Sequence, residues 1–250
     1  MTRPVPDAAA PGDVSPSYEG RDLEALSGLP NYYAWIADLL TPGLSGRTLE
    51  IGAGIGANAD WALAQTTGMD LVEPSENLVP RLRERHGDKP GVTVTGSTLE
   101  DFTPTVADAS YDTILLVNVL EHIEDDAAAL AEFYRMLKPG GHLLLYVPAL
   151  SFLFSPLDRL VGHYRRYHKP AMTALVRQAG FEIARATYCD MLGILPWYLV
   201  NRLMGATEIN PAMAKLYDSV GVPVTRFVES LIPAPAGKNI ALIARKPVNS

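Results

Sequence analysis

Short apolar runs alternate with amphipathic segments along most of this 250-residue chain. An apolar run of about four to eight residues between turn residues is typical of a strand buried on both faces of a parallel sheet. Segments with apolar residues about every three or four positions are typical of helices that pack on such a sheet. Seven runs fit a strand: Arg47–Ile51, Asp70–Glu73, Val92–Thr95, Tyr111–Val117, His142–Val147, Phe181–Tyr188 and Asn239–Arg245.

Because helical patterns separate most of these runs, we predict an α/β fold with parallel strands joined by right-handed βαβ crossovers. A further helix, Asn31–Leu40, precedes the first strand. Residues 1–17 are rich in Pro, Ala, Asp and Ser, so we expect a disordered lead there and a single domain over 18–250. Segments 149–169 and 191–236 break the alternation, and we expect them to be insertions on the substrate side or to form a lid.

The first strand runs into a turn with glycine at alternate positions, Gly52 and Gly54 among them. Glycine lets the backbone turn tightly, and the amides that open the next helix can face the polar groups of a ligand. Glu50 stands just inside this strand end, and Glu73 ends the second strand, where a carboxylate can accept hydrogen bonds from both ribose hydroxyls. The turn predicts a cofactor that contains a nucleoside. With Ala57 it also fits the G-x-G-x-x-G/A pattern, so an NAD(P)-dependent oxidoreductase stays open.

Composition narrows the classes of partner. The net charge of −7 argues against a nucleic-acid substrate, because phosphate contacts dominate such binding. The one cysteine, Cys189, excludes a disulfide within the chain and any cysteine-based metal site. No apolar signal core opens the sequence and no apolar run reaches about 18 residues, so we expect a cytoplasmic protein without a membrane span.

Two further motifs accompany the glycine turn. Tyr111–Ile123 joins a buried strand to the residues Asn118-Val119-Leu120-Glu121-His122, and Leu137-Lys138-Pro139-Gly140-Gly141 comes before the next strand. Glu50 also occupies a strand end that dinucleotide-binding folds usually fill with an apolar residue. With these motifs the chain resembles a class I S-adenosylmethionine-dependent methyltransferase over roughly residues 31–181. It is more loosely similar to stand-alone bacterial methyltransferases of natural-product or cell-surface biosynthesis.

The resemblance implies a Rossmann-like three-layer sandwich whose seven-stranded, mostly parallel sheet has the order 3-2-1-4-5-7-6, with strand 7 antiparallel. It implies S-adenosyl-L-methionine as the cofactor and S-adenosyl-L-homocysteine as its product. The glycine turn would line the methionine part, Glu73 would hold the ribose, and Asn118 and Val119 would lie beneath the sulfonium. Many family members carry an acid where this chain has Ser97, so a serine hydroxyl or Glu100 would meet the adenine amine instead. The predicted cofactor-binding residues are Tyr33, Glu50, Gly52, Ala53, Gly54, Asn58, Glu73, Pro74, Ser97, Thr98, Leu99, Asn118, Val119 and His122. Tyr33 is included because an aromatic face can sit against a sulfonium or close the cleft, with a helix that only caps the sheet as the alternative.

Methyl transfer from a sulfonium is an in-line displacement, so the protein must align the reacting atoms and exclude water. An oxygen or amine acceptor must also lose a proton, and His122 and His163 are the candidate catalytic bases. For His122 a role in shaping the cofactor pocket is the alternative. The acidic run Glu124–Asp126 stands at a helix start, where carboxylates are favourable, so no metal is expected.

The segment Gly162–Lys169 combines basic and aromatic side chains between the fifth strand and the next helix. Arginine binds phosphate or carboxylate through two parallel hydrogen bonds, so a clamp on the substrate is one interpretation. A solvated basic turn with its tyrosines packed on the domain edge is the other. The predicted substrate residues are Tyr164, Arg165, Arg166 and Tyr167.

The acceptor is expected to be a small molecule methylated on O or N: a natural product, a sugar or a lipid-linked intermediate. The Asn/Asp-Pro-Pro-Tyr signature of enzymes that methylate flipped bases does not follow the fourth strand. The apolar stretch Met191–Val200 leaves association with a membrane surface open, beside a buried lid or dimer contact. We expect a monomer or a homodimer. A non-catalytic domain that keeps the nucleoside pocket is a further alternative.

Overall fold

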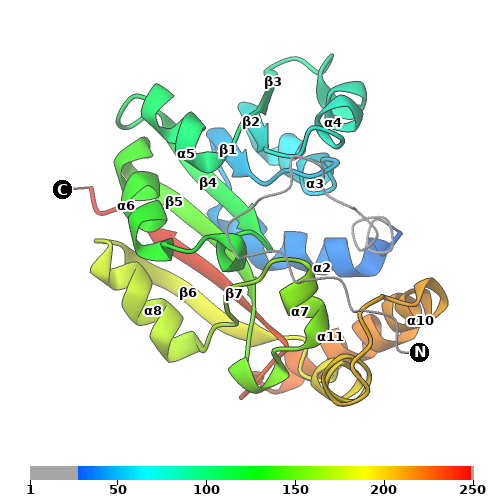
Figure 1. Ribbon diagram of the computed structural model, residues 1–250. Helices are drawn as coiled ribbons and strands as arrows, with labels where there is room; N and C mark the ends of the chain where they lie inside the picture. The colour runs from blue at the N-terminus through cyan, green and yellow to red at the C-terminus, as the bar shows by residue number, and fades with distance from the viewer. Residues whose placement is uncertain (1–27, 249–250) are drawn as a thin grey trace, which may run out of the picture.

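One twisted sheet crosses the molecule in the computed structural model, which describes residues 28–248 (Figure 1). Its strands in the described part of the chain are β1 (Arg47–Ile51), β2 (Gly68–Glu73), β3 (Val92–Gly96), β4 (Tyr111–Val117), β5 (Leu137–Pro148), β6 (Glu182–Cys189) and β7 (Asn239–Arg245). Their order is β3-β2-β1-β4-β5-β7-β6. Strand β7 runs antiparallel to both its neighbours, and the other pairs are parallel. The predicted class, strand order and antiparallel strand are confirmed. The predicted disordered lead lies outside the described residues.

Helices cover both faces of the sheet, which gives the three predicted layers (Figure 1). Helices α2, α3 and α4 pack on one face, and α5, α6 and α8 pack on the other. The helices in the described residues are α2 (Pro30–Leu40), α3 (Ala59–Ala62), α4 (Val79–His86), α5 (Leu99–Phe102), α6 (Asp126–Met136), α7 (Pro156–Leu160), α8 (Lys169–Gln178), α9 (Ile194–Trp197), α10 (Pro211–Leu216) and α11 (Val222–Leu231).

Strand β4 explains why its sequence is almost continuously apolar. Successive side chains of a strand point to opposite faces. Ile114 and Leu116 therefore enter the core beneath Phe133 of α6, whereas Leu115 enters the opposite core with Trp35 of α2. Both cores exclude water from these side chains, and this burial of apolar surface is the main favourable term in folding.

The fifth strand begins earlier than the sequence pattern indicates. We expected it to start at His142, after a Pro-Gly-Gly turn, but β5 begins at Leu137. Leu137 pairs with Tyr111 across an irregularity in the ladder, and Gly140 adopts a positive φ of 81°. Such a bulge accommodates an extra residue without ending the strand. A turn motif in this chain is therefore built into a strand.

The two segments expected to be insertions both leave the sheet at the carboxyl ends of strands, 149–169 after β5 and 191–236 after β6. The first contains α7, and the second contains α9, α10, α11 and two π-helical turns, η6 (Tyr198–Leu203) and η7 (Tyr217–Gly221). Ligands of parallel sheets bind at this edge, so a lid or substrate-side role stays a prediction for both segments. No helix among residues 28–248 combines the length and apolar character needed to span a membrane.

Candidate active site

The glycine turn lies where the chain order of the strands reverses. Strand β1 is flanked by β2 on one side and β4 on the other, so the carboxyl ends of three strands meet there. These ends carry Glu50, Glu73 and Asn118, which belong to three separate parts of the sequence. A crevice at such a switch point is where open α/β sheets bind their ligands.

The backbone of the turn requires its glycines. Gly52, Gly54 and Gly56 have φ values of 67°, 57° and 81°, which residues with a Cβ rarely adopt. A Cβ placed on Gly52 would lie 2.5 Å from Cγ2 of Val119. The turn therefore packs directly against the residue that follows β4, and Ala53 is fixed by a 3.0 Å hydrogen bond from its amide to the carbonyl of Val72.

Glu50 is a buried carboxylate with an incomplete set of partners. It is 1% exposed, and the Nδ2 of Asn58 donates to its Oε1 over 3.1 Å. Neither Oε2 of Glu50 nor Oδ1 of Asn58 has a hydrogen-bond partner among the described residues. Burial raises the pKa of Glu50 to about 8, and the Asn58 hydrogen bond partly opposes this. Two buried acceptor oxygens side by side suit a cationic donor such as the ammonium group of a bound amino acid.

Glu73 is held rigidly at the end of β2. The amide of Gly54 donates to its Oε2 over 2.8 Å, and the amide of Ser75 donates to its Oε1 over 2.9 Å. Each oxygen keeps a second lone pair, so the carboxylate can still accept hydrogen bonds from ligand hydroxyls. Pro74, between these residues, is half-buried.

The residues predicted beside the adenine lie after β3. The amide of Ser97 donates to the carbonyl of Glu73 over 3.2 Å, which brings this turn next to the ribose carboxylate. Thr98 caps α5, because its side chain accepts a hydrogen bond from the amide of Asp101. Leu99 opens that helix and packs against the core. Adenine contact stays a prediction for these residues.

Tyr33 reaches the glycine turn from α2. It lines a surface cavity of about 340 Å³ together with Ala57 and Trp61. Because Ala57 belongs to the glycine turn and Trp61 to α3, this cavity adjoins the turn on the side of α3, and cofactor contact stays a prediction for Tyr33.

Asn118 turns the chain sharply after β4. Its φ is 53°, a left-handed conformation that asparagine tolerates better than most residues, and its amide donates to the carbonyl of Tyr146 over 2.8 Å. A 3₁₀ turn, η4 (Leu120–His122), follows, closed by a 2.9 Å hydrogen bond from the amide of His122 to the carbonyl of Val119. The turn brings Glu121 and His122 back beside the strand end.

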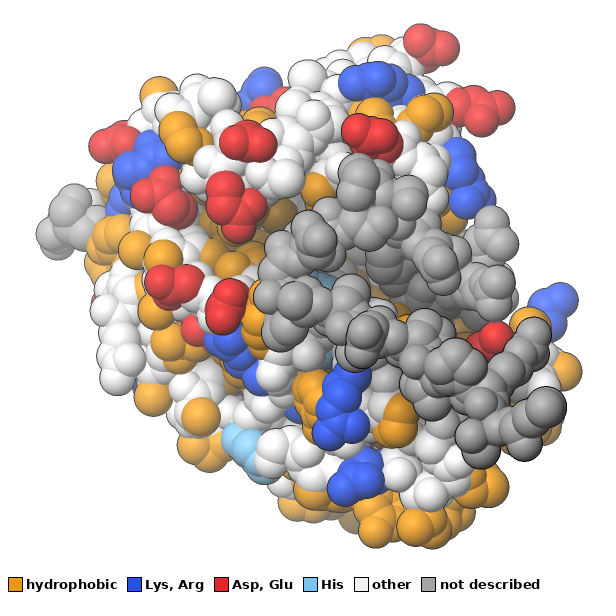
Figure 2. Space-filling model, in the orientation of Figure 1, with side chains coloured by type: hydrophobic (Ala, Val, Ile, Leu, Met, Phe, Trp, Pro, Cys, Tyr) orange, Lys and Arg blue, Asp and Glu red, His pale blue; other side chains and the backbone are white. Residues whose placement is uncertain are grey.

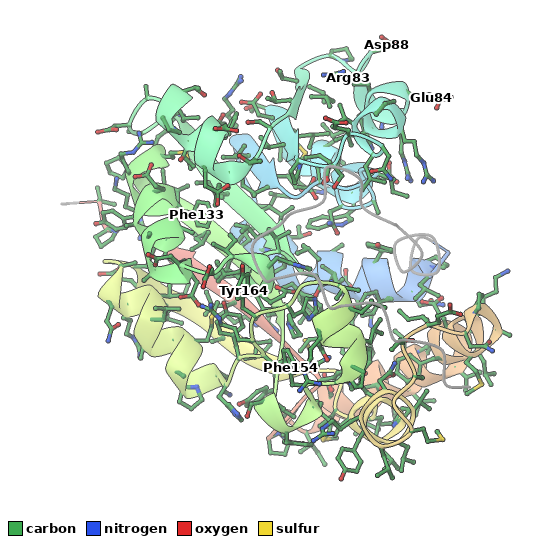
Figure 3. The ribbon with its side chains drawn as sticks, in the orientation of Figure 1. Arg83, Glu84, Asp88, Phe133, Phe154 and Tyr164 are labelled. Carbon is green, nitrogen blue, oxygen red and sulfur yellow. The ribbon has the colours of Figure 1, made fainter. Side chains whose placement is uncertain are left out.

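The two predicted catalytic histidines meet at this turn. The rings of His122 and His163 are perpendicular, with their centroids 4.6 Å apart. Nδ1 of His163 lies 2.8 Å from Oδ1 of Asp158, and its Nε2 lies 3.9 Å from Oε1 of Glu121. The amide of Tyr164, labelled near the centre of Figure 3, donates to the carbonyl of Glu121 over 2.9 Å and so ties the two segments together.

Burial dominates the electrostatics of this cluster. Glu121 is 0% exposed, and burial raises its pKa to about 7, an effect that the nearby His163 partly opposes. Burial and then His163 lower the pKa of His122 to about 3. Asp158 is also buried, but hydrogen bonds and the Arg166 charge outweigh burial and lower its pKa to about 2. Asp158 is therefore the ionised member of the cluster at neutral pH, and His122 is neutral.

The predicted substrate residues are engaged within the chain. Nη2 of Arg166 lies 2.8 Å from Oδ1 of Asp158, and this guanidinium also stacks over the ring of Trp197. Asp126, at the start of α6, binds both Nη1 of Arg165, at 2.6 Å, and the hydroxyl of Tyr167, at 2.9 Å. A clamp on the substrate stays a prediction, and it requires these arginines to exchange intramolecular partners for the ligand.

Asp158 is the residue that sequence reasoning missed. The pattern Ser155-Pro156-Leu157-Asp158 is a capping box, in which the amide of Asp158 donates to Oγ of Ser155 over 3.4 Å and the amide of Ser155 donates to Oδ2 of Asp158 over 2.7 Å. That pattern signals the start of α7. It carries no sign that the same carboxylate also holds His163 and Arg166.

Comparison with known proteins identifies the family of this chain. A family model described as "Methyltransferase domain" matches residues 26–186. The chain belongs to the class I S-adenosylmethionine-dependent methyltransferases. The methyltransferase is 30% identical to the ubiquinone biosynthesis O-methyltransferase of Xanthomonas axonopodis pv. citri, over 76% of this chain and 82% of that relative.

Solved structures share the fold of this methyltransferase. An S-adenosylmethionine-dependent methyltransferase from Mesorhizobium loti superposes with a TM-score of 0.60 at 17% identity, covering 86% of this chain and 98% of that one. Phosphoethanolamine N-methyltransferase 2 of Haemonchus contortus, in complex with S-adenosyl-L-methionine, superposes with a TM-score of 0.58 at 21% identity. The match covers 87% of this chain and 52% of that one. S-adenosyl-L-methionine is the cofactor of this methyltransferase, which decides the ambiguity of the glycine turn against a dinucleotide.

Proposed function

We propose that this methyltransferase transfers the methyl group to a hydroxyl oxygen of a small molecule. The observation that carries the proposal is the Glu121–His122–His163 cluster, which lies at the turn after Asn118 and Val119. Those two residues would lie beneath the sulfonium if the implication of the family resemblance holds. A hydroxyl group is a poor nucleophile until its proton leaves, so it needs such a cluster near the methyl carbon. The relative from Xanthomonas is named an O-methyltransferase, which supports the same choice.

The chain's own residues suit the cofactor at the other end of the crevice. The ammonium group of S-adenosyl-L-methionine would supply the donor that Oε2 of Glu50 and Oδ1 of Asn58 lack. The ribose hydroxyls would reach the free lone pairs of Glu73, and the glycine turn would let the methionine part approach the backbone. These contacts would fix the methyl group toward η4, in line with an acceptor that arrives from the side of segment 149–169.

A labelling experiment tests the proposed reaction. The protein is incubated with a cell extract and S-adenosyl-L-methionine that carries a deuterated methyl group, and labelled products are found by mass spectrometry. We expect a labelled small molecule whose fragmentation places the methyl group on oxygen, with E50A, the matched cofactor-site variant, as the inactive control. Label on nitrogen, on carbon or on a macromolecule would contradict the proposal.

We also infer that the acceptor is lipid-linked and that the methyltransferase meets it at a membrane surface. Figure 2 shows apolar side chains gathered along the lower edge of the molecule, where Figure 1 draws the gold-coloured segment η6. Leu203 and Met204, at the end of η6, are 66% and 70% exposed, so a lid buried in this chain does not describe that part of the segment. Exposed apolar residues also recur every third or fourth position along the α10–α11 region: Met213, Leu216, Val220, Val224, Phe227 and Leu231.

This face has the character of an interfacial surface. An apolar patch spread over several helices is unusual on a protein that only meets water, and Arg202 and Lys215 beside it are exposed cations that suit lipid phosphates. The name of the Xanthomonas relative places that enzyme in ubiquinone biosynthesis, which supports an apolar acceptor for this chain as well.

A further inference from the structure

The cluster at η4 has the composition of a metal site. Glu121, His122 and His163 each offer one ligand atom, and these atoms all lie within 4.8 Å of one another. Neither carboxylate oxygen of Glu121 has a hydrogen-bond partner among the described residues, although the side chain is fully buried. A buried carboxylate without donors is costly, so this one calls for a cation that the protein side chains do not supply.

The orientation of His163 supports the same conclusion. Its Nδ1 lies 2.8 Å from Oδ1 of Asp158, which fixes the ring and leaves Nε2 facing Glu121. Asp158 is itself held by Arg166 and by Ser155. In metal sites a ligating histidine almost always gives its other ring nitrogen to a carboxylate or carbonyl in this manner. The supporting contacts of a ligand are thus already in place around His163.

We propose that Glu121, His122 and His163 bind a divalent transition-metal cation, of the zinc or manganese class, at the acceptor end of the methyltransferase site. Two imidazoles and one carboxylate are a donor set that such cations prefer, and three protein ligands leave coordination positions for an acceptor oxygen. Cation binding stands on the cluster alone. The catalytic consequence rests on the proposed O-methylation.

This assignment differs from the expectation of no metal, which considered only the acidic run 124–126. Asp125 caps α6 by accepting a 2.9 Å hydrogen bond from the amide of Ala128, and Asp126 is paired with Arg165. Those carboxylates therefore have structural partners, as expected. The proposed ligands are instead Glu121 and His122, which lie shortly before that run, together with His163 from segment 149–169.

The bound cation would prepare the acceptor for methyl transfer. A hydroxyl group coordinated to a divalent cation loses its proton to solvent at a lower pH than a free hydroxyl. Its oxygen then forms a bond to the methyl carbon while the carbon–sulfur bond breaks, and the electron pair of that bond stays on sulfur. A cationic sulfonium and an anionic oxygen thereby give a neutral thioether and a neutral ether, so atoms and charges balance.

Metal binding can be measured without the reaction. The full chain, stripped with a chelator and dialysed, is titrated calorimetrically with ZnCl₂ or MnCl₂, and Co²⁺ is added in parallel as a spectroscopic probe. We expect stoichiometric binding and a visible absorption band from cobalt bound to nitrogen and oxygen ligands. E121Q and H163A should each weaken binding by at least about 100-fold. H168A is the matched control. His168 is an exposed histidine in the same segment as His163, and it lies outside the cluster, where it contacts Ser151.

Two further measurements keep the outcomes distinct. Binding of S-adenosyl-L-methionine by E121Q and H163A should stay within about threefold of the unaltered protein, which shows that the variants fold. Unaltered protein that binds none of the three cations overturns the metal site. If labelled methyl transfer to oxygen also continues in excess chelator, the proposed reaction stands while the metal inference fails.

Discussion

Glu50 shows how burial sets the chemistry of one side chain. Its pKa is raised from an ordinary value of 4.5 to about 8, chiefly by burial. The folded protein therefore holds this proton more tightly than the unfolded chain, and ionisation of Glu50 lowers the stability of the cofactor-free protein as pH rises from about 4.5 through 8. Burial therefore opposes the charged form in the cofactor-free protein, and a bound ammonium group would favour it.

The first prediction concerns stability and pH. Glu50→Gln should raise the free energy of unfolding of the cofactor-free protein at pH 9 by roughly a few kcal/mol, because glutamine has no charge to bury. This magnitude follows from the size of the pKa shift of Glu50. At pH 5 the two proteins should differ little, since Glu50 is then protonated. Thermal unfolding at both pH values measures the difference, and a gain that does not depend on pH would refute the explanation.

The second prediction concerns the cofactor. The same Glu50→Gln substitution should weaken S-adenosyl-L-methionine binding by roughly 10- to 100-fold, because a neutral amide replaces a charge-assisted hydrogen bond. Asp60 provides the matched control. It is a half-exposed carboxylate on α3, just after the glycine turn, and it pairs with Arg85. Asp60→Asn should leave the affinity within about threefold by calorimetry. Equal losses in both variants would assign the effect to net charge.

At the scale of elements, the glycine turn combines two separate constraints. Gly52 has a positive φ and would also meet Val119 if it carried a Cβ. Gly205 has a positive φ of 71° but no neighbouring atom within 4 Å of a Cβ. The pair therefore separates backbone strain from steric contact between the turn and the end of β4.

The third prediction uses this pair. Gly205→Ala should lower the free energy of unfolding by about 1–2 kcal/mol, the cost of the left-handed conformation alone. Gly52→Ala should cost more, because Val119 must also move, and it should weaken cofactor binding. Urea denaturation and calorimetry measure the two quantities. The explanation fails if Gly52→Ala is no more destabilising than Gly205→Ala.

The sequence predicted the elements best where burial alone decides them. The bounds of β1, β4 and β7 agree with the apolar runs, because those strands lie between two helical layers and most of their side chains are buried apolar groups. The start of β5 was missed, since its first residues depend on a bulge opposite Tyr111 and on a positive φ at Gly140. Pairing with a neighbouring strand overrides local turn chemistry there.

At the scale of the whole molecule, strand order explains how much of the site could be predicted. The proposed cofactor residues follow consecutive strand ends, so the motif and the topology together place them. The cluster of Glu121, His163 and Asp158 could not be assembled in this way, because it depends on side-chain contacts between η4 and the irregular segment 149–169. The pairing of Arg166 could not be predicted either, because the basic sequence motif around it does not indicate that Asp158 is its buried partner.

The fourth prediction concerns the exposed apolar face. The protein should sediment with vesicles of phosphatidylcholine and phosphatidylglycerol, and a Phe227→Ser, Leu231→Ser variant should lose most of that binding, because both side chains are largely exposed on α11. Cofactor affinity should not change, since α11 lies away from the glycine turn. A dimer in light scattering that the same variant dissociates, without vesicle binding, would assign the face to a second copy instead.

Asp158 closes the capping box of α7 and also fixes the ring of His163. These two duties are mechanically coupled, because the first turn of α7 cannot unwind without moving the carboxylate that orients the histidine. If the segment opened by unwinding α7 to admit the proposed acceptor, the contact that orients His163 would therefore be lost in the same movement. Under the proposed function, the cluster would then be assembled only while the segment is closed.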